Sequence, residues 1–94
     1  MDRQDMINEI IDYLTKSGVK KIALFGSFAR CQESPESDID ILVEFKDSVS
    51  LLGLARLERE LSERLASNVD LLTPASISPY IMENIREELE VIYG

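Results

Sequence analysis

The 94-residue chain contains no histidine and a single cysteine, Cys31. Without histidine, neither a serine–histidine nor a cysteine–histidine catalytic pair can form, and histidine-ligated metal sites are excluded. One cysteine cannot make an internal disulfide or a cysteine-built zinc site. The polar groups that remain are carboxylates, hydroxyls, lysine, arginine and the backbone. This set suits hard cations that prefer oxygen ligands.

Basic residues are also scarce, because ten Lys and Arg stand against eighteen Asp and Glu and give a net charge of −8. A general nucleic-acid binder needs a basic surface, so we expect no direct nucleic-acid binding. No apolar run is long enough to cross a membrane, and residues 1–5 lack the apolar core of a signal peptide. We therefore expect a cytoplasmic protein that does not bind membranes. The length predicts one domain over residues 1–94.

Hydrophobic periodicity and turn residues divide the chain into alternating helices and strands. The predicted elements are a helix over 3–17, a strand over 21–25, the start of a short helix over 28–31, a loop over 32–37, a strand over 38–45, a helix over 51–66, a strand over 69–72 and a helix from Pro79 to the end. This α-β-α-β-α-β-α order predicts an α/β fold, a small mixed β-sheet with flanking helices.

The connections predict how the strands pair. The second and third strands are joined through a long helix, which allows a parallel crossover, whereas the first two are close enough in sequence to pair antiparallel. Alternate positions of the second strand fall into an apolar set, Ile39, Ile41, Val43 and Phe45, and a second set, Asp38, Asp40, Leu42 and Glu44. One face of this strand therefore belongs to the core, and the other presents the carboxylates of Asp38, Asp40 and Glu44.

Asp38 and Asp40 project from one face of the strand about 6.5–7 Å apart. Two carboxylates so close repel each other unless a cation lies between them, and an unpaired carboxylate on an apolar face is costly. Asp70 interrupts the apolar third strand. If that strand lies beside the second, three carboxylates can hold two metal ions about 3.5–4 Å apart for displacement at phosphorus. The alternative for Asp38 and Asp40 is a solvated strand start.

Gly26 and Ser27 follow the first strand, where a helix is expected to begin. Glycine lets the backbone approach a phosphate closely, and amides at a helix start point toward an anion. The Ser27 hydroxyl adds another donor. Arg30 can reach either a phosphate or a nearby acidic residue, and both readings stay open.

Together these residues resemble a known signature. Gly26-Ser27-Phe28-Ala29-Arg30, followed by Ser37-Asp38-Ile39-Asp40-Ile41-Leu42-Val43, resembles the motif of the polymerase-β-like nucleotidyltransferases: a Gly-Ser pair, ten residues, then Asp-x-Asp. The resemblance covers residues 20–73, and the short length is similar to the minimal nucleotidyltransferase (MNT) group. One position departs from the pattern, because Cys31 stands where this group commonly has glycine.

The resemblance implies a role for each motif residue. Asp38 and Asp40 would ligate two Mg²⁺ ions, and Asp70 would share a metal and deprotonate or orient the attacking hydroxyl. Gly26 and Ser27 would hold the β- and γ-phosphates of ATP, with Arg30 as a further nucleotide contact. A nucleoside monophosphate would pass to an acceptor hydroxyl as pyrophosphate leaves.

The acceptor must come from elsewhere, since the chain has no room for a second lobe. By resemblance to the MNT group, the partner would be a HEPN-domain toxin, the acceptor a tyrosine of that toxin, and the chain its antitoxin. The charge of −8 supports an alternative, a non-catalytic antitoxin that neutralises a basic partner by binding it. Transfer to a small molecule such as an aminoglycoside is a third reading.

Overall fold

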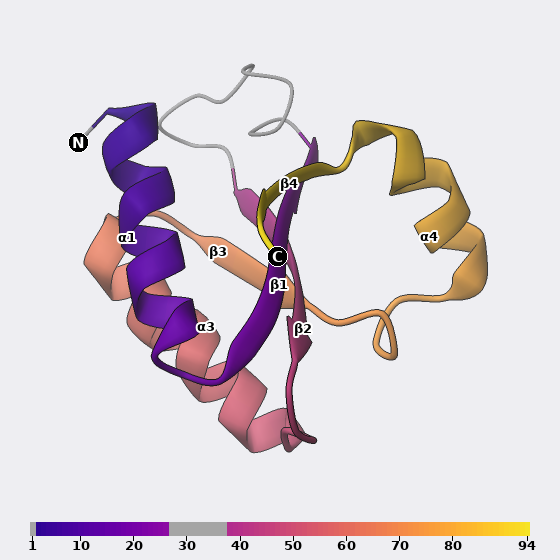
Figure 1. The fold of residues 1–94 in the computed structure, drawn as a ribbon, viewed down its shortest axis with the longest axis horizontal. Helices are drawn as coiled ribbons and strands as arrows, with labels where there is room; N and C mark the ends of the chain where they lie inside the picture. The colour runs from indigo at the N-terminus through magenta and orange to yellow at the C-terminus, as the bar shows by residue number, and fades with distance from the viewer. Residues whose placement is uncertain (1, 27–37) are drawn as a thin grey trace.

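A computed structural model describes residues 2–26 and 38–94, and Figure 1 shows the arrangement of the elements. The elements are α1 (Arg3–Thr15), β1 (Val19–Phe25), β2 (Ile39–Phe45), α3 (Leu51–Leu65), β3 (Val69–Leu72), α4 (Pro79–Ile85), a 3₁₀ turn η1 (Arg86–Glu88) and β4 (Glu90–Tyr93). The predicted α/β fold with a small mixed sheet is confirmed. The short helix and loop predicted over 28–37 lie outside the described residues.

The four strands form one sheet in the order β3-β2-β1-β4. β1 pairs antiparallel with β2, and β2 pairs parallel with β3. Both pairings agree with the prediction from connection lengths, because α3 supplies the crossover that a parallel pair requires. The sheet therefore places the strands of Asp40 and Asp70 side by side.

The prediction of a C-terminal helix that runs to the end of the chain is wrong for the last residues. α4 ends at Ile85, and residues 90–93 form strand β4, which pairs antiparallel with the free edge of β1 (Figure 1). Val91, Ile92 and Tyr93 are β-branched or aromatic and suit a pleated strand. Leu89 and Ile92, which the helical spacing placed on one stripe, pack against opposite faces of the sheet. The remaining predicted boundaries lie within two residues of those observed.

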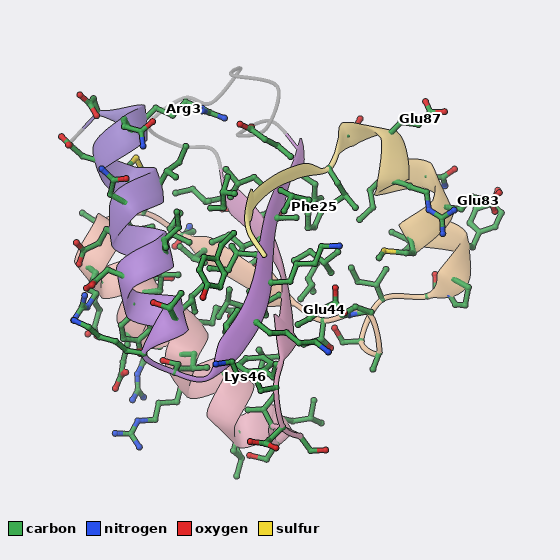
Figure 2. The ribbon with its side chains drawn as sticks, in the orientation of Figure 1. Arg3, Phe25, Glu44, Lys46, Glu83 and Glu87 are labelled. Atoms are coloured by element: carbon green, nitrogen blue, oxygen red, sulfur yellow. The ribbon has the colours of Figure 1, made fainter. Side chains whose placement is uncertain are left out.

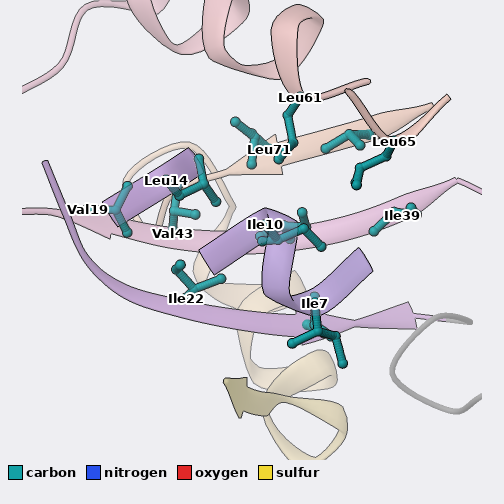
Figure 3. Packing of buried hydrophobic residues seen from close by; sticks show 13 residues of the cluster. Ile7, Ile10, Leu14, Val19, Ile22, Ile39, Val43, Leu61, Leu65 and Leu71 are labelled. Atoms are coloured by element: carbon teal, nitrogen blue, oxygen red, sulfur yellow. The ribbon is translucent and has the colours of Figure 1, made fainter. Parts of the chain in front are cut away.

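One face of the sheet is covered by α1 and α3, and the main core lies between them (Figures 1 and 3). The core contains Ile7, Ile10, Leu14, Val19, Ile22, Leu24, Ile39, Ile41, Val43, Leu61, Leu65, Val69 and Leu71. Side-chain caps define where the helices begin: Asp2 accepts from the amide of Asp5, Ser50 from Gly53, and Ser78 from Ile81. None of the described helices is long and apolar enough to cross a membrane.

The opposite face carries a smaller apolar cluster of Ala23, Phe25, Leu42 and Ile77, against which Met82 and Ile85 of α4 pack. Figure 2 shows Phe25 and Glu44 on this side of the sheet, toward α4. The alternation predicted for β2 is confirmed, because its apolar set packs into the main core whereas Leu42 belongs to the second face. Asp40 shares the face of Leu42.

Truncation of Leu61 tests the main core. Its side chain is fully buried between α3 and the sheet, so Leu61→Ala is expected to lower the free energy of unfolding by about 2–5 kcal/mol through lost burial and a cavity. Leu52 lies on the same helix with 85% of its surface exposed, so Leu52→Ala is expected to change it by less than about 0.5 kcal/mol. Urea unfolding followed by circular dichroism measures both. Equal losses in the two variants would contradict this packing.

Candidate active site

The parallel pairing of β2 with β3 brings two of the predicted carboxylates together. Asp40 is the register partner of Asp70, with Ile39 opposite Val69 and Ile41 opposite Leu71. Neighbouring strands lie about 4.8 Å apart, and register partners in a parallel pair project from the same face. Two acidic side chains from segments 30 residues apart in sequence (70 − 40) therefore lie side by side.

The surroundings of Asp40 disfavour its ionised form. The pKa of Asp40 is raised from 3.8 to about 6 by burial, which is the largest cause, together with the charge of Asp70, a hydrogen bond with Asp70 and the charge of Asp38. Two carboxyl groups can share a hydrogen bond only when one of them is protonated. A cation bound between Asp40 and Asp70 would remove the repulsion between their two carboxylates.

Gly26 packs directly against the Asp40 carboxyl group. Phe25 is the register partner of Asp40, so Gly26 follows where β1 passes the carboxylates. Its φ of +73° lies in the left-handed region that favours glycine. A Cβ at this position would overlap Oδ2 of Asp40 and lie 3.3 Å from its Cγ. Because Gly26 has no side chain, the Asp40 carboxyl group has room to lie against it.

Asp38 lies exposed immediately before β2, close enough for its charge to act on Asp40. The structure thus brings together Gly26, Asp40 and Asp70, with Asp38 beside them. Ser27 and Arg30, the other predicted nucleotide contacts, lie outside the described residues, as does Cys31.

The residues present fit a magnesium ion. Within residues 2–26 and 38–94, no three acidic, histidine or cysteine side chains already form a complete metal site. Mg²⁺ does not require one, because it binds proteins through one or two carboxylates and completes its shell with water and substrate phosphates. The Asp40–Asp70 pair supplies such oxygens, and Gly26 keeps the space beside them free of a side chain.

A small mixed sheet with paired carboxylates on neighbouring strands, beside a glycine turn, defines a domain suited to phosphoryl or nucleotidyl transfer. Comparison with known proteins makes this specific. The family model described as polymerase beta, nucleotidyltransferase, matches residues 8–94. The chain therefore belongs to the polymerase β nucleotidyltransferase family and is a minimal nucleotidyltransferase.

Individual relatives agree with this assignment. A Methanocaldococcus jannaschii protein, provisionally named a protein adenylyltransferase, is 47% identical over 88 residues, which cover 94% of this chain and 95% of the relative. A crystal structure of a toxin–antitoxin with AMP-PNP contains a chain with a TM-score of 0.85 and 29% identity, covering 94% of this chain and 73% of that one. A structure of a tri-AMPylated Shewanella oneidensis HEPN toxin in complex with MNT antitoxin contains a chain with a TM-score of 0.82 and 27% identity. The match covers 99% of this chain and 73% of that one.

The sequence did not reveal the contact between Gly26 and Asp40. The pattern assigned Gly26 only to phosphate binding, because glycine before a helix start suggests a close backbone approach. The contact depends on the register between β1 and β2, which pairs Phe25 with Asp40. No local feature of a single sequence encodes that register. The signal that the sequence offered was a glycine directly after the predicted first strand.

Proposed function

We propose that this protein transfers AMP from ATP to a tyrosine hydroxyl of a HEPN-domain toxin, in a Mg²⁺-dependent reaction, and thereby acts as its antitoxin. The observation that carries the proposal is the pairing of Asp40 with Asp70 against the side-chain-free surface of Gly26. Membership of the nucleotidyltransferase family and the AMPylated toxin in a similar complex support the choice of reaction and acceptor.

In the proposed reaction, the protein mainly positions its substrates. The tyrosine oxygen forms a bond to the α-phosphorus of ATP, the bond from that phosphorus to the β-phosphate oxygen breaks, and Asp70 accepts the tyrosine proton. Asp38, Asp40 and Asp70 would hold divalent cations, which supply charge neutralisation for the triphosphate and the leaving pyrophosphate. Gly26, with Ser27 and Arg30, would hold the phosphates. Such positioning accounts for most of the catalysis in reactions of this type.

The charge distribution supports a protein acceptor. The net charge is −8, and an acidic protein attracts a basic partner during encounter. A toxin that binds RNA would carry the complementary basic surface. A nucleotide with bound Mg²⁺ can enter the same acidic site because the cations offset the charge of the triphosphate.

The proposal is tested by incubating the purified protein with the HEPN protein encoded beside it, ATP and Mg²⁺, and searching for AMP by intact-mass and peptide mass spectrometry. We expect adducts of one AMP mass or more on tyrosine of the partner, none with EDTA, and none with Asp70→Asn. The matched control is Asp12→Asn, on an exposed residue of α1, which should transfer as the wild type does. Adducts that persist with Asp70→Asn would contradict the site.

The alternative, neutralisation by binding alone, has its own outcome. If Asp70→Asn still protects cells from the toxin and forms the complex, catalysis is unnecessary and the acidic surface is enough. If protection is lost while the complex still forms in gel filtration, the transfer reaction is what neutralises the toxin. The two results separate catalysis from binding because Asp70→Asn removes only one of eighteen acidic residues. The acidic surface that would attract a basic partner is therefore almost unchanged.

A further inference from the structure

The strand that carries Asp70 is held in place by two side chains of the preceding helix. Among the strands of residues 2–26 and 38–94, β3 lies at the edge of the sheet and pairs with β2 alone. On its other side, the amide of Val69 donates a hydrogen bond to Oγ of Ser62 (3.0 Å), and the amide of Leu71 donates to Oε2 of Glu58 (2.9 Å). These two amides flank Asp70 in sequence. We refer to Glu58 and Ser62 together as the α3 clamp.

The geometry of the helix and the strand explains why two residues are enough. Four residues along a helix rise about 6 Å, and two residues along a strand rise about 6.6 Å. Glu58 and Ser62 therefore match Leu71 and Val69 when α3 runs antiparallel to β3. A short turn gives this orientation, with Ala66 in the left-handed conformation at φ +52°.

The α3 clamp is itself fixed. The hydroxyl of Ser62 donates to the carbonyl oxygen of Glu58 (2.8 Å), which leaves its oxygen to accept from Val69. Leu61 and Leu65, on the same helix, are buried in the core and anchor α3 on the sheet. Both clamp side chains are half-buried, so water competes less for their hydrogen bonds than at an exposed strand edge.

We propose that Glu58 and Ser62 are positioning residues for Asp70: by holding the backbone on both sides of it, they fix its carboxyl group opposite Asp40. This inference rests on the proposed function for its catalytic consequence. Consecutive amides of a strand point to opposite edges, so the clamp occupies the outer edge and leaves the inner edge to pair with β2. Without it, an edge strand of four residues has hydrogen bonds on one side only. Asp70 then loses the fixed separation from Asp40 that a shared metal ion needs.

The test compares Glu58→Ala, Ser62→Ala and the double variant with the wild type. Mutation of residues that orient a metal ligand without touching the metal typically lowers metal affinity or activity by about 10–100-fold. For the double variant we therefore expect Mn²⁺ to bind about 10–100-fold more weakly in the nucleotide-free protein. We expect kcat for AMP transfer to fall by a similar factor, while KM for ATP changes by less than about threefold, as for a group acting mainly in the transition state.

Two further variants separate positioning from general stability. Glu58→Gln keeps an oxygen that can accept from the amide of Leu71, so it should retain wild-type Mn²⁺ affinity and kcat. Glu63→Ala removes an exposed carboxylate from the same helix and should also retain both. Measurements are made well below each variant's Tm. If the double variant does not fold, Ser62→Ala alone is expected to show a smaller loss in both quantities.

The proposal is overturned if Glu58→Gln loses as much as Glu58→Ala, or if the folded clamp variants keep wild-type Mn²⁺ affinity. Failure of the proposed function looks different. In that case the wild-type protein transfers no AMP to any partner, while the comparison of Mn²⁺ affinities still reports on the α3 clamp.

Discussion

Asp40→Asn is expected to abolish AMP transfer and, in the absence of divalent cations, to make the protein more stable. Interactions of a catalytic cation are worth several kcal/mol in the transition state, so loss of a ligand should lower kcat by at least about 10³-fold. The gain in stability has a different origin. Burial and the neighbouring acidic groups raise the pKa of Asp40 to about 6, so at neutral pH the folded protein holds an unfavourable charge that asparagine lacks.

The pH dependence of this gain follows from the sign of the shift. Because the pKa of Asp40 is higher in the folded state than its ordinary 3.8, the folded state binds the proton more tightly. The contribution of Asp40 to stability is therefore present below about pH 4 and is lost as the pH rises through about 6. Without metal at pH 8, Asp40→Asn should therefore have a higher Tm than the wild type, by about 4–8 °C for each kcal/mol gained in the free energy of unfolding. The difference in Tm should become smaller as the pH falls toward 4.

Differential scanning calorimetry at pH 4, 6 and 8, with and without Mg²⁺, measures the effect. Mg²⁺ should raise the Tm of the wild type more than that of Asp40→Asn, since only the wild type keeps both paired carboxylates. Asp47→Asn, an exposed residue after β2, is the control for loss of one negative charge and should change neither activity nor the pH profile. A Tm difference that grows toward pH 4 would contradict the burial of a repelled carboxylate.

Gly26→Ala is expected to inactivate the protein more severely than the same change at Gly18. Both glycines have positive φ, +73° and +87°, so an added Cβ strains either position by about 1–2 kcal/mol. Only at Gly26 does the Cβ overlap the carboxyl group of Asp40. That group must then shift from the position it occupies beside Gly26. A displacement of about 1 Å in a catalytic group can cost about 10²-fold in rate.

Gly18→Ala is a matched control, because no described atom lies within 4 Å of an added Cβ there. We expect both variants to lose stability to a similar degree in urea unfolding, and kcat for AMP transfer to fall about 10²-fold only in Gly26→Ala. Binding of Mn²⁺ should weaken in the same variant alone. Equal kcat in the two folded variants would show that the close contact with Asp40 has no part in catalysis.

The arrangement of Asp40 and Asp70 could be predicted because it depends on patterns that a single sequence carries. Alternation in residues 38–45 predicted which face Asp40 occupies, and the long helical connection allowed the second and third strands to pair parallel. The two core clusters confirm the faces of β2, and the register that pairs Asp40 with Asp70 confirms the parallel pairing. The role of each aspartate stays a prediction, as do the roles of Ser27 and Arg30.

The C-terminal segment could not be predicted in the same way. Residues 81, 85, 89 and 92 are spaced as on a helix, and the competing partner, the free edge of β1, lies about 70 residues earlier in the chain. Hydrogen bonding to that edge outweighed the local periodicity, because unpaired strand amides next to a core are costly. The α3 clamp was missed for a related reason: Glu58 and Ser62 look like ordinary polar positions of an amphipathic helix until β3 is seen beside them.

The α3 clamp also has a consequence for self-association. An open strand edge is a template on which another molecule can add a strand and begin aggregation. At β3, the outward amides of Val69 and Leu71 are already occupied by helix side chains. β4, at the other end of the sheet, exposes Val91 and Tyr93. Within the described sheet, strand addition at high concentration would therefore begin at β4, two strands away from Asp40, and leave the carboxylate pair open to solvent.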